Sequence, residues 1–165
     1  MDKNKLSITQ IKDNNIKQYV LSYNNKDIMY KIDDKESENY ICDFGIEKLN
    51  KQNRLNISIM NGYKEGLIRF INYWEMYFKN SDLCKGYNLL SCIKNRDKFD
   101  PIIVLHLKYR KNKIITDINN ITWSELEKMN KFKINGYIVI NCLWLNEFEN
   151  TFGISLDWKE INYIK

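Results

Sequence analysis

Leu105-His106-Leu107-Lys108-Tyr109-Arg110-Lys111, residues 105–111, alternates apolar with cationic side chains and indicates a β-strand. Alternation with a period of two is typical of a strand that has one buried and one solvated face. Tyr109 is expected with the two leucines on the apolar face. His106, Lys108 and Arg110 are expected on the opposite face, where they would form a row of positive charge.

Positive charge is concentrated around this stretch. Residues 85–115 hold eight Lys/Arg against two Asp, whereas the whole chain has a net charge of only +5. A row of cations on a sheet is either a solvated face or a track for a phosphate backbone, and both interpretations stay open at this point. The candidate cations for such a track are Lys94, Arg96, Lys108, Arg110, Lys111 and Lys113.

Length and composition predict a single domain over residues 1–165. Hydrophobic residues make up 44% and charged residues 28%, which is typical of a globular domain. The chain has no alanine, and lysine outnumbers arginine 22 to 4. Because Lys, Asn and Ile have A/T-rich codons, this bias indicates an A/T-rich genome, such as that of a virus, a plasmid, a protist or a low-GC bacterium.

The cysteines and the N-terminus bear on the compartment. The four cysteines form no CxxC pair and lie in or beside apolar runs, so we expect buried free thiols in a reducing environment. No apolar run has the length of a membrane span, and residues 1–6 lack a signal-peptide core. We expect a cytoplasmic protein, at a viral or plasmid replication site or in a virion, with no membrane partner.

Periodicity predicts a mainly β fold with two helices. Apolar residues recur at helical spacing from Lys64 to Lys79, and Thr122 with Glu125 forms a capping-box pattern before a second, shorter helix. Short strands separated by polar turns fill the rest, and the segment Asp33–Glu38 is expected to be a solvated turn. The predicted strands are 6–11, 16–23, 28–32, 40–46, 55–60, 87–94, 101–110, 114–118, 137–145 and 152–161, with a tight turn at Lys111-Asn112.

Signals for catalysis are poor. The sequence contains no GxxxxGK[ST], GxGxxG, HExxH or GxSxG motif, and one histidine cannot supply a histidine-based metal site. His106 is expected to be a polar surface residue rather than a base. We therefore predict a non-enzymatic protein with no catalytic residues, no metal and no cofactor.

The last third of the chain adds paired tryptophans. Cys142-Leu143-Trp144-Leu145 and Phe152-Gly153-Ile154-Ser155-Leu156-Asp157-Trp158-Lys159 are predicted to form a terminal hairpin. Gly153 inside a strand indicates a bulge or a close backbone approach. Trp144 and Trp158 are either core residues or platforms on which unpaired bases stack.

The order of these elements resembles that of a known family. A basic strand (102–110), a capped helix (122–130), a strand ending in Trp144 and an "FG" strand carrying a second tryptophan are similar to the OB-fold single-stranded DNA-binding proteins of nucleocytoplasmic large DNA viruses and virus-like linear plasmids, which themselves resemble the T7 phage single-stranded DNA-binding protein. The resemblance covers residues 55–161. It implies an OB-like antiparallel barrel, here with an added N-terminal hairpin region, that coats single-stranded DNA during replication.

By position, the resemblance implies that Lys108, Arg110, Lys111 and Lys113 line the backbone track, with Tyr109, Trp144 and Trp158 as candidate aromatics. The phage proteins end in an acidic tail that recruits replication partners, whereas this chain ends in Lys165. Recruitment of replication proteins would therefore need another surface.

The sequence thus predicts a single-stranded DNA-binding protein of low sequence specificity. Two alternatives stay open. The charge argument does not separate DNA from RNA. An exposed patch of Trp74 and Phe78 on the aromatic helix would instead indicate a structural or interaction subunit of a viral or plasmid transcription or virion assembly. Edge strands in the N-terminal half would also allow two copies to pair as a homodimer.

Overall fold

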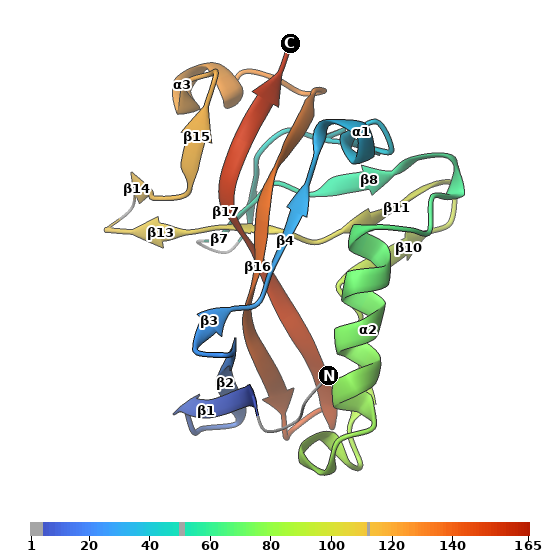
Figure 1. The fold of residues 1–165 in the computed structure, drawn as a ribbon, viewed down its shortest axis with the longest axis vertical. Coiled ribbons are helices and arrows are strands. Elements are labelled where there is room, and N and C mark those ends of the chain that lie inside the picture. The colour runs from blue at the N-terminus through green and yellow to red at the C-terminus, as the bar shows by residue number, and fades with distance from the viewer. Residues whose placement is uncertain (1–4, 50–51, 112) are drawn as a thin grey trace.

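The computed structural model describes residues 5–49, 52–111 and 113–165, and it is mainly β with three α-helices (Figure 1). The predicted class is confirmed, and the N-terminal hairpin is present as β1 paired with β2. In the described part of the chain, no helix has the length and apolar character needed to cross a bilayer.

Short strands dominate the first half of the chain. Its elements are β1 (Leu6–Lys12), β2 (Ile16–Tyr23), β3 (Lys26–Asp27), β4 (Met29–Ile32), α1 (Asp34–Ser37), β5 (Tyr40–Ile41), β6 (Glu47–Leu49), β7 (Gln52–Arg54), β8 (Ile57–Ile59) and α2 (Leu67–Lys79). The second half contains β9 (Asn88–Leu89), β10 (Ile93–Arg96), β11 (Phe99–Ile103), β12 (His106–Leu107), β13 (Tyr109–Arg110), β14 (Lys113–Ile114), β15 (Asp117–Asn119), α3 (Trp123–Leu126), β16 (Lys133–Asn146) and β17 (Thr151–Ile164).

A long hairpin of β16 and β17, 14 residues each, forms the spine of the molecule (Figure 1). The large sheet runs in the order β1-β2-β16-β17-β12-β7-β6, and β12 lies parallel to β17. This order places β12, which lies within the basic stretch, directly beside the terminal hairpin, and β7 on the far side of β12.

A smaller sheet has the order β10-β11-β8-β5. It adjoins the large sheet along the chain, because β8 follows β7 and β11 precedes β12. The chain passes from β7 to β8 and from β11 to β12 through short links, where the Leu55 N–H donates to the Leu105 carbonyl at 3.0 Å. A single bridge between Cys42 and Phe132 connects the end of β5 to the start of β16. No sheet formed by the described residues closes on itself, so the expected barrel stays a prediction.

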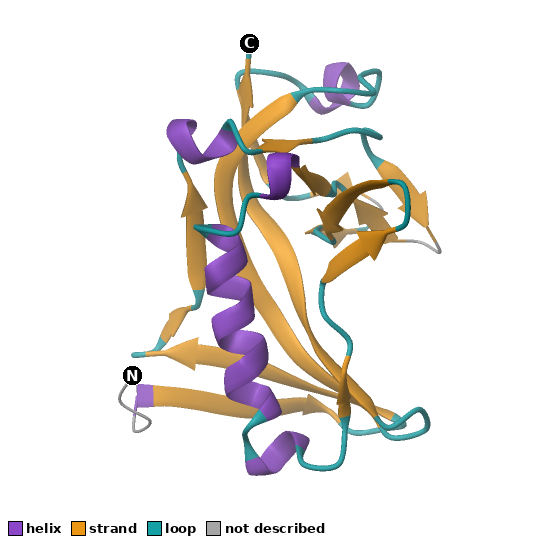
Figure 2. Ribbon diagram, turned by 90° about the vertical axis from the view of Figure 1, so that its right-hand side faces the viewer, coloured by secondary structure: helices purple, strands orange, loops and turns teal. Residues whose placement is uncertain are grey.

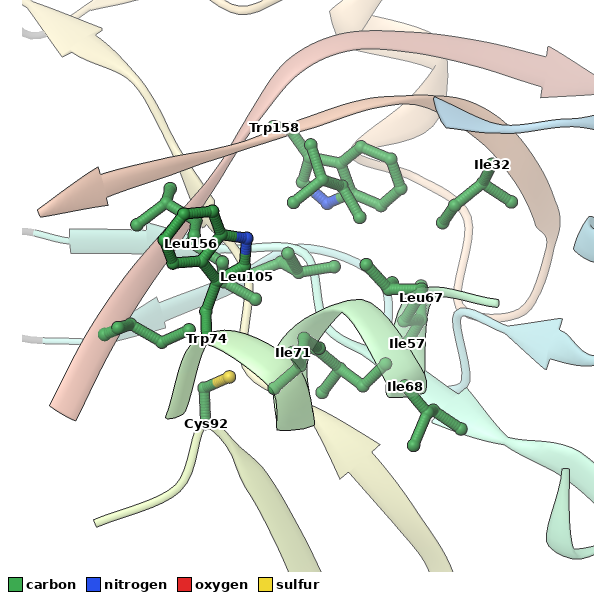
Figure 3. Packing of buried hydrophobic residues seen from close by; sticks show 14 of the residues in the cluster. Ile32, Ile57, Leu67, Ile68, Ile71, Trp74, Cys92, Leu105, Leu156 and Trp158 are labelled. Carbon is green, nitrogen blue, oxygen red and sulfur yellow. The ribbon is translucent and has the colours of Figure 1, made fainter. Parts of the chain in front are cut away.

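The core lies between the long hairpin and α2. Trp74 of α2 points toward Leu156 of β17, and Trp158 lies in the same cluster (Figure 3). Figure 2 shows α2 in front of the hairpin. The helical spacing predicted for 64–79 is confirmed. Trp74 and Phe78 are 5% and 0% exposed, so they form no patch, and the alternative based on that patch loses its support.

The expected solvated turn at Asp33–Glu38 is instead the short helix α1, which half-buries Glu36. The Glu36 carboxylate accepts hydrogen bonds from the hydroxyls of Tyr30 (2.6 Å) and Tyr40 (3.0 Å), and from the Leu67 N–H (2.7 Å). Leu67 begins α2, so this carboxylate satisfies an amide that the helix itself leaves unpaired. Glu36 therefore has a structural role in positioning α2. All four cysteines are buried free thiols, as predicted.

Candidate nucleic-acid interface

A groove of about 650 Å³ lies over the part of the large sheet where β7, β12, β17 and β16 are neighbours. Four residues predicted from the sequence contribute to its lining: Lys94, Lys108, Tyr109 and Trp144. The structure adds Arg54 and His106 to them. Cations and aromatic rings from four separate segments of the chain therefore meet in one concave site.

Strand register fixes the floor of the groove. His106 is opposite Arg54 on one side and opposite Asp157 on the other, so these three residues form a row across β7, β12 and β17. Neighbouring strands lie about 4.8 Å apart, which brings a cation, an imidazole and a carboxylate side by side. The His106 ring is anchored to the sheet by a contact of 3.2 Å between its Nδ1 and the Leu156 carbonyl.

Burial shifts the ionisation of two groups in this row. It lowers the pKa of His106 below its usual 6.5, so the imidazole is neutral at pH 7. It raises the pKa of Asp157 to about 6, although the positive charge of Lys108 opposes part of this rise. Asp157 is thus a buried carboxylate that is charged at neutral pH, and it is the one acidic residue in the described row.

Trp144 owes its position to Gly153. The two residues are opposite each other on β16 and β17, and a Cβ atom added to Gly153 would lie 2.6 Å from the Trp144 ring and 2.6 Å from the Leu90 carbonyl. Only a residue without a side chain leaves room for the indole to lie over the strand. The close approach predicted from a glycine inside a strand is confirmed, and its consequence is a half-buried indole that faces the groove.

The prediction that Tyr109 shares the buried face of Leu105 and Leu107 is wrong. Both leucines are buried, but Tyr109 is 37% exposed and lines the groove with Lys108. The alternation breaks at Lys108, whose N–H donates to the Thr116 hydroxyl at 3.0 Å instead of to a neighbouring strand. The Tyr109 hydroxyl accepts a hydrogen bond from the Asn53 side chain, which fixes the ring at the rim.

The cations of the groove form no ion pair with a described acidic side chain, whereas several cations elsewhere do. Lys17, Arg69 and Lys159 lie 2.5, 2.8 and 3.4 Å from the carboxylates of Glu147, Glu65 and Asp27. Among the described residues, no ion pair within 4.0 Å involves any of the groove cations Arg54, Lys94 and Lys108. The Nε of Arg54 is also buried with no hydrogen-bond partner in the described structure. The described lining of the groove therefore carries net positive charge, since it contains Arg54, Lys94 and Lys108 against the carboxylate of Asp157.

The other predicted cations lie outside the groove lining. Arg110 and Lys113 are paired on the β13–β14 hairpin, which projects from the sheet directly after Tyr109 (Figure 1). Lys111 is at the tip with a φ of 49°, and Asn112, the other residue of the predicted turn, is outside the described residues. Arg96 lies on β10, where its guanidinium forms cation–π contacts with two phenylalanine rings.

The prediction of Trp158 as a base platform is wrong. Its side chain is 0% exposed, and its Nε1–H donates to the Leu55 carbonyl at 2.9 Å inside the core (Figure 3). A base could reach this ring only if the core opened.

Arg54 is the functional candidate that the sequence analysis missed. It directly precedes the strand predicted at 55–60 and is distant in sequence from the cations at 85–115. One signal was available, since Arg54 is one of only four arginines in a chain where lysine dominates. Arginine presents five N–H donors in a planar fork that suits phosphate.

Two further observations concern cofactors and relatives. The described residues contain no group of three or more His, Cys, Asp or Glu side chains arranged to hold a metal ion. In comparisons with known proteins, no family model and no curated protein matches this chain.

Proposed function

We propose that this protein binds single-stranded DNA with low sequence specificity and coats it during replication. The observation that carries the proposal is the meeting of Trp144 and Tyr109 with Arg54, Lys94 and Lys108 in one groove. Proteins that bind single strands combine a positively charged groove, which follows the phosphates, with aromatic rings on which bases stack. Both components are needed, and the groove contains both.

The gathering of Arg54, Lys94 and Lys108 in one concave site supports this proposal over a merely solvated face. Some surface lysines, such as Lys17 and Lys159, form ion pairs with carboxylates. The groove cations have no such partner among the described residues, so a polyanion would release counterions without having to displace an internal ion pair. The projecting hairpin with Arg110, Lys111 and Lys113 adds exposed charge next to the groove.

Strand pairing supports an OB-type relationship. Five segments are linked by pairing of 40–42 with 57–59, 52–59 with 99–107, 106–107 with 157–158 and 151–164 with 133–146. An isolated bridge between Phe132 and Cys42 brings the first segment near the start of β16 without closing a sheet. All of these pairings are antiparallel except that of β12 with β17, and α3 lies between the third and fourth segments. A five-stranded, partly open Greek-key barrel is the OB architecture, and its second and third strands carry the binding face. Here those two segments supply Arg54 and His106 to the groove, and Lys108 directly follows the third segment.

The test is binding of labelled oligothymidine over a range of salt concentrations. We expect affinity to fall steeply with salt, with a slope of log K against log salt of about −0.7 for each phosphate contacted. Replacing Arg54 and Lys108 by glutamine should weaken binding and flatten the slope. The matched control is Lys35→Gln, because Lys35 is exposed on α1, which adds no described residue to the groove.

A flat salt response, or equal binding by the groove variant and the Lys35 control, would contradict the proposal. Competition with an RNA oligomer of matched length and sequence distinguishes the RNA-binding alternative. Preference for DNA by the wild-type protein supports the proposal, and preference for RNA contradicts it.

A further inference from the structure

A second group of rings and charge lies at the smaller sheet, with Arg96 on β10, Phe99 on β11 and Phe44 in the loop after β5. The Arg96 guanidinium is 5.5 Å from the centre of the Phe44 ring and 5.4 Å from the centre of the Phe99 ring. Phe44 and Phe99 are 57% and 67% exposed, so each ring keeps much of its surface in solvent. We call Phe44, Arg96 and Phe99 the Phe–Arg–Phe cluster.

The guanidinium of the cluster is held in place but keeps its charge available. Its Nε–H donates to the Asp100 carbonyl at 2.7 Å, and one terminal nitrogen donates to the Ser58 hydroxyl at 3.3 Å. These bonds use two of the five N–H groups of an arginine. No carboxylate among the described residues forms an ion pair with Arg96. A fixed, uncompensated cation between two exposed rings can contact a phosphate while the rings accept bases.

The cluster is continuous with the groove through Lys94. Lys94 and Arg96 are two residues apart on β10, and the irregularity in the β10–β11 pairing is on β11, where Phe99 and Ile102 are three residues apart. Lys94 and Arg96 therefore point to the same side of the sheet. Lys94 is opposite Ile102, which is opposite Ser58, the residue that the Arg96 guanidinium contacts.

Stability alone does not account for two exposed phenylalanines. A cation–π contact at an exposed site contributes about 0.5–1 kcal/mol, and one ring would supply it. The cluster instead has the same composition as the groove, with aromatic rings beside a cation that forms no ion pair with a described carboxylate. It lies next to Lys94, at the edge of the groove.

We propose that the Phe–Arg–Phe cluster is a second base-stacking subsite for single-stranded DNA that continues out of the groove. This inference rests on the proposed function. Bases stack on the solvent-facing surfaces of Phe44 and Phe99, and Arg96 contacts a phosphate between them. The subsite therefore acts on strands long enough to reach beyond Lys94, whereas short strands occupy the groove alone.

The experiment compares the affinity for a short and a long oligothymidine, of about 4 and about 16 nucleotides, the range of site sizes found for single OB folds. We expect the Phe44→Leu, Phe99→Leu double variant to bind the long oligomer about tenfold more weakly than wild type, and the short oligomer equally well. Leucine keeps apolar bulk and removes the flat ring. Tyr73→Leu is the matched control, because Tyr73 is an exposed ring of α2 outside the groove and the cluster.

The outcomes separate the two proposals. If Trp144→Ala weakens binding of both oligomers while the double variant binds both like wild type, the second subsite is wrong and the groove stands. An equal loss on both oligomers in the double variant also overturns the second subsite, because the cluster would then act on the groove itself. If wild type binds neither oligomer at low salt, the proposed function fails and the subsite fails with it. A thermal unfolding curve of the double variant that matches wild type assigns any loss to binding.

Discussion

Trp144 and Trp158 lie on the two strands of one hairpin and have opposite environments. Trp144 is opposite Gly153 and lies half-buried in the groove, whereas Trp158 is opposite Ile138 and has no exposed surface. One ring is available to a ligand, and the other holds the hairpin to the segment before β8 through the Leu55 carbonyl. Residue type alone thus says little about role, because the strand face and the size of the cross-strand partner decide it.

We expect the largest effect on stability from changing the buried ring of Trp158. Trp158→Ala should lower the free energy of unfolding by about 3–5 kcal/mol, since it removes a large buried side chain and leaves a cavity. Chemical denaturation measures this change. Trp158→Phe keeps most of the volume and leaves the Leu55 carbonyl without its donor, so a smaller loss of about 1–3 kcal/mol is expected. A loss below 1 kcal/mol in both variants would contradict a core role.

The exposed ring should give the reverse pattern. Trp144→Ala is expected to weaken oligothymidine binding by about 1–3 kcal/mol, the contribution of one stacked base, and to change stability less than Trp158→Ala does. Fluorescence anisotropy with a labelled oligomer gives the affinity, and denaturation of the same sample gives the stability. Equal affinity for wild type and Trp144→Ala would remove the indole from the binding site.

Much of this difference could be predicted from period-two patterns. Phe152, Ile154, Leu156 and Trp158 alternate along one strand, and all four are buried, so their shared face was readable from the sequence. Trp144 falls out of phase with its buried neighbours Leu143 and Leu145 in the same way. These patterns indicate which ring is in the core once the hairpin itself is recognised.

Other features depend on contacts that are distant in sequence. Tyr109 leaves the buried pattern of the two leucines where the Lys108 amide donates to Thr116. Arg54 reaches the groove because β7 pairs with β12 across more than fifty residues. Glu36 is ordered by the start of α2, 31 residues away. Local periodicity predicted the mainly β class and the main helix. It did not predict where strand pairing stops or which segments it brings together.

A smaller effect concerns the acidic member of the groove. Burial raises the pKa of Asp157 from its usual 3.8 to about 6, so the folded protein binds this proton more tightly than the unfolded chain does. The stability from Asp157 is therefore fully present below about pH 4 and is lost as pH rises through about 6. Asp157→Asn should remove this fall, as measured by denaturation between about pH 4 and about pH 8.

The same substitution tests the electrostatics of binding. At pH 8 the ionised carboxylate opposes the phosphates, so Asp157→Asn should tighten oligothymidine binding by roughly two- to tenfold. Near pH 5 the wild-type carboxyl is largely protonated, and the two proteins should bind alike. An identical ratio of affinities at both pH values would exclude Asp157 as the source of the difference.

The smallest effect is expected for Lys94→Gln, and it separates the contribution of a cation from that of an aromatic ring. Lys94→Gln removes one cation from the boundary between the groove and the Phe–Arg–Phe cluster while leaving Trp144 in place. The slope of log K against log salt should become shallower by about 0.7, the value of one phosphate contact on a single strand. Trp144→Ala, by contrast, should lower affinity at every salt concentration without changing the slope, because stacking on a neutral ring releases no counterion. A changed salt slope in Trp144→Ala, or an unchanged slope in Lys94→Gln, would contradict the assignment of base stacking to Trp144 and a phosphate contact to Lys94.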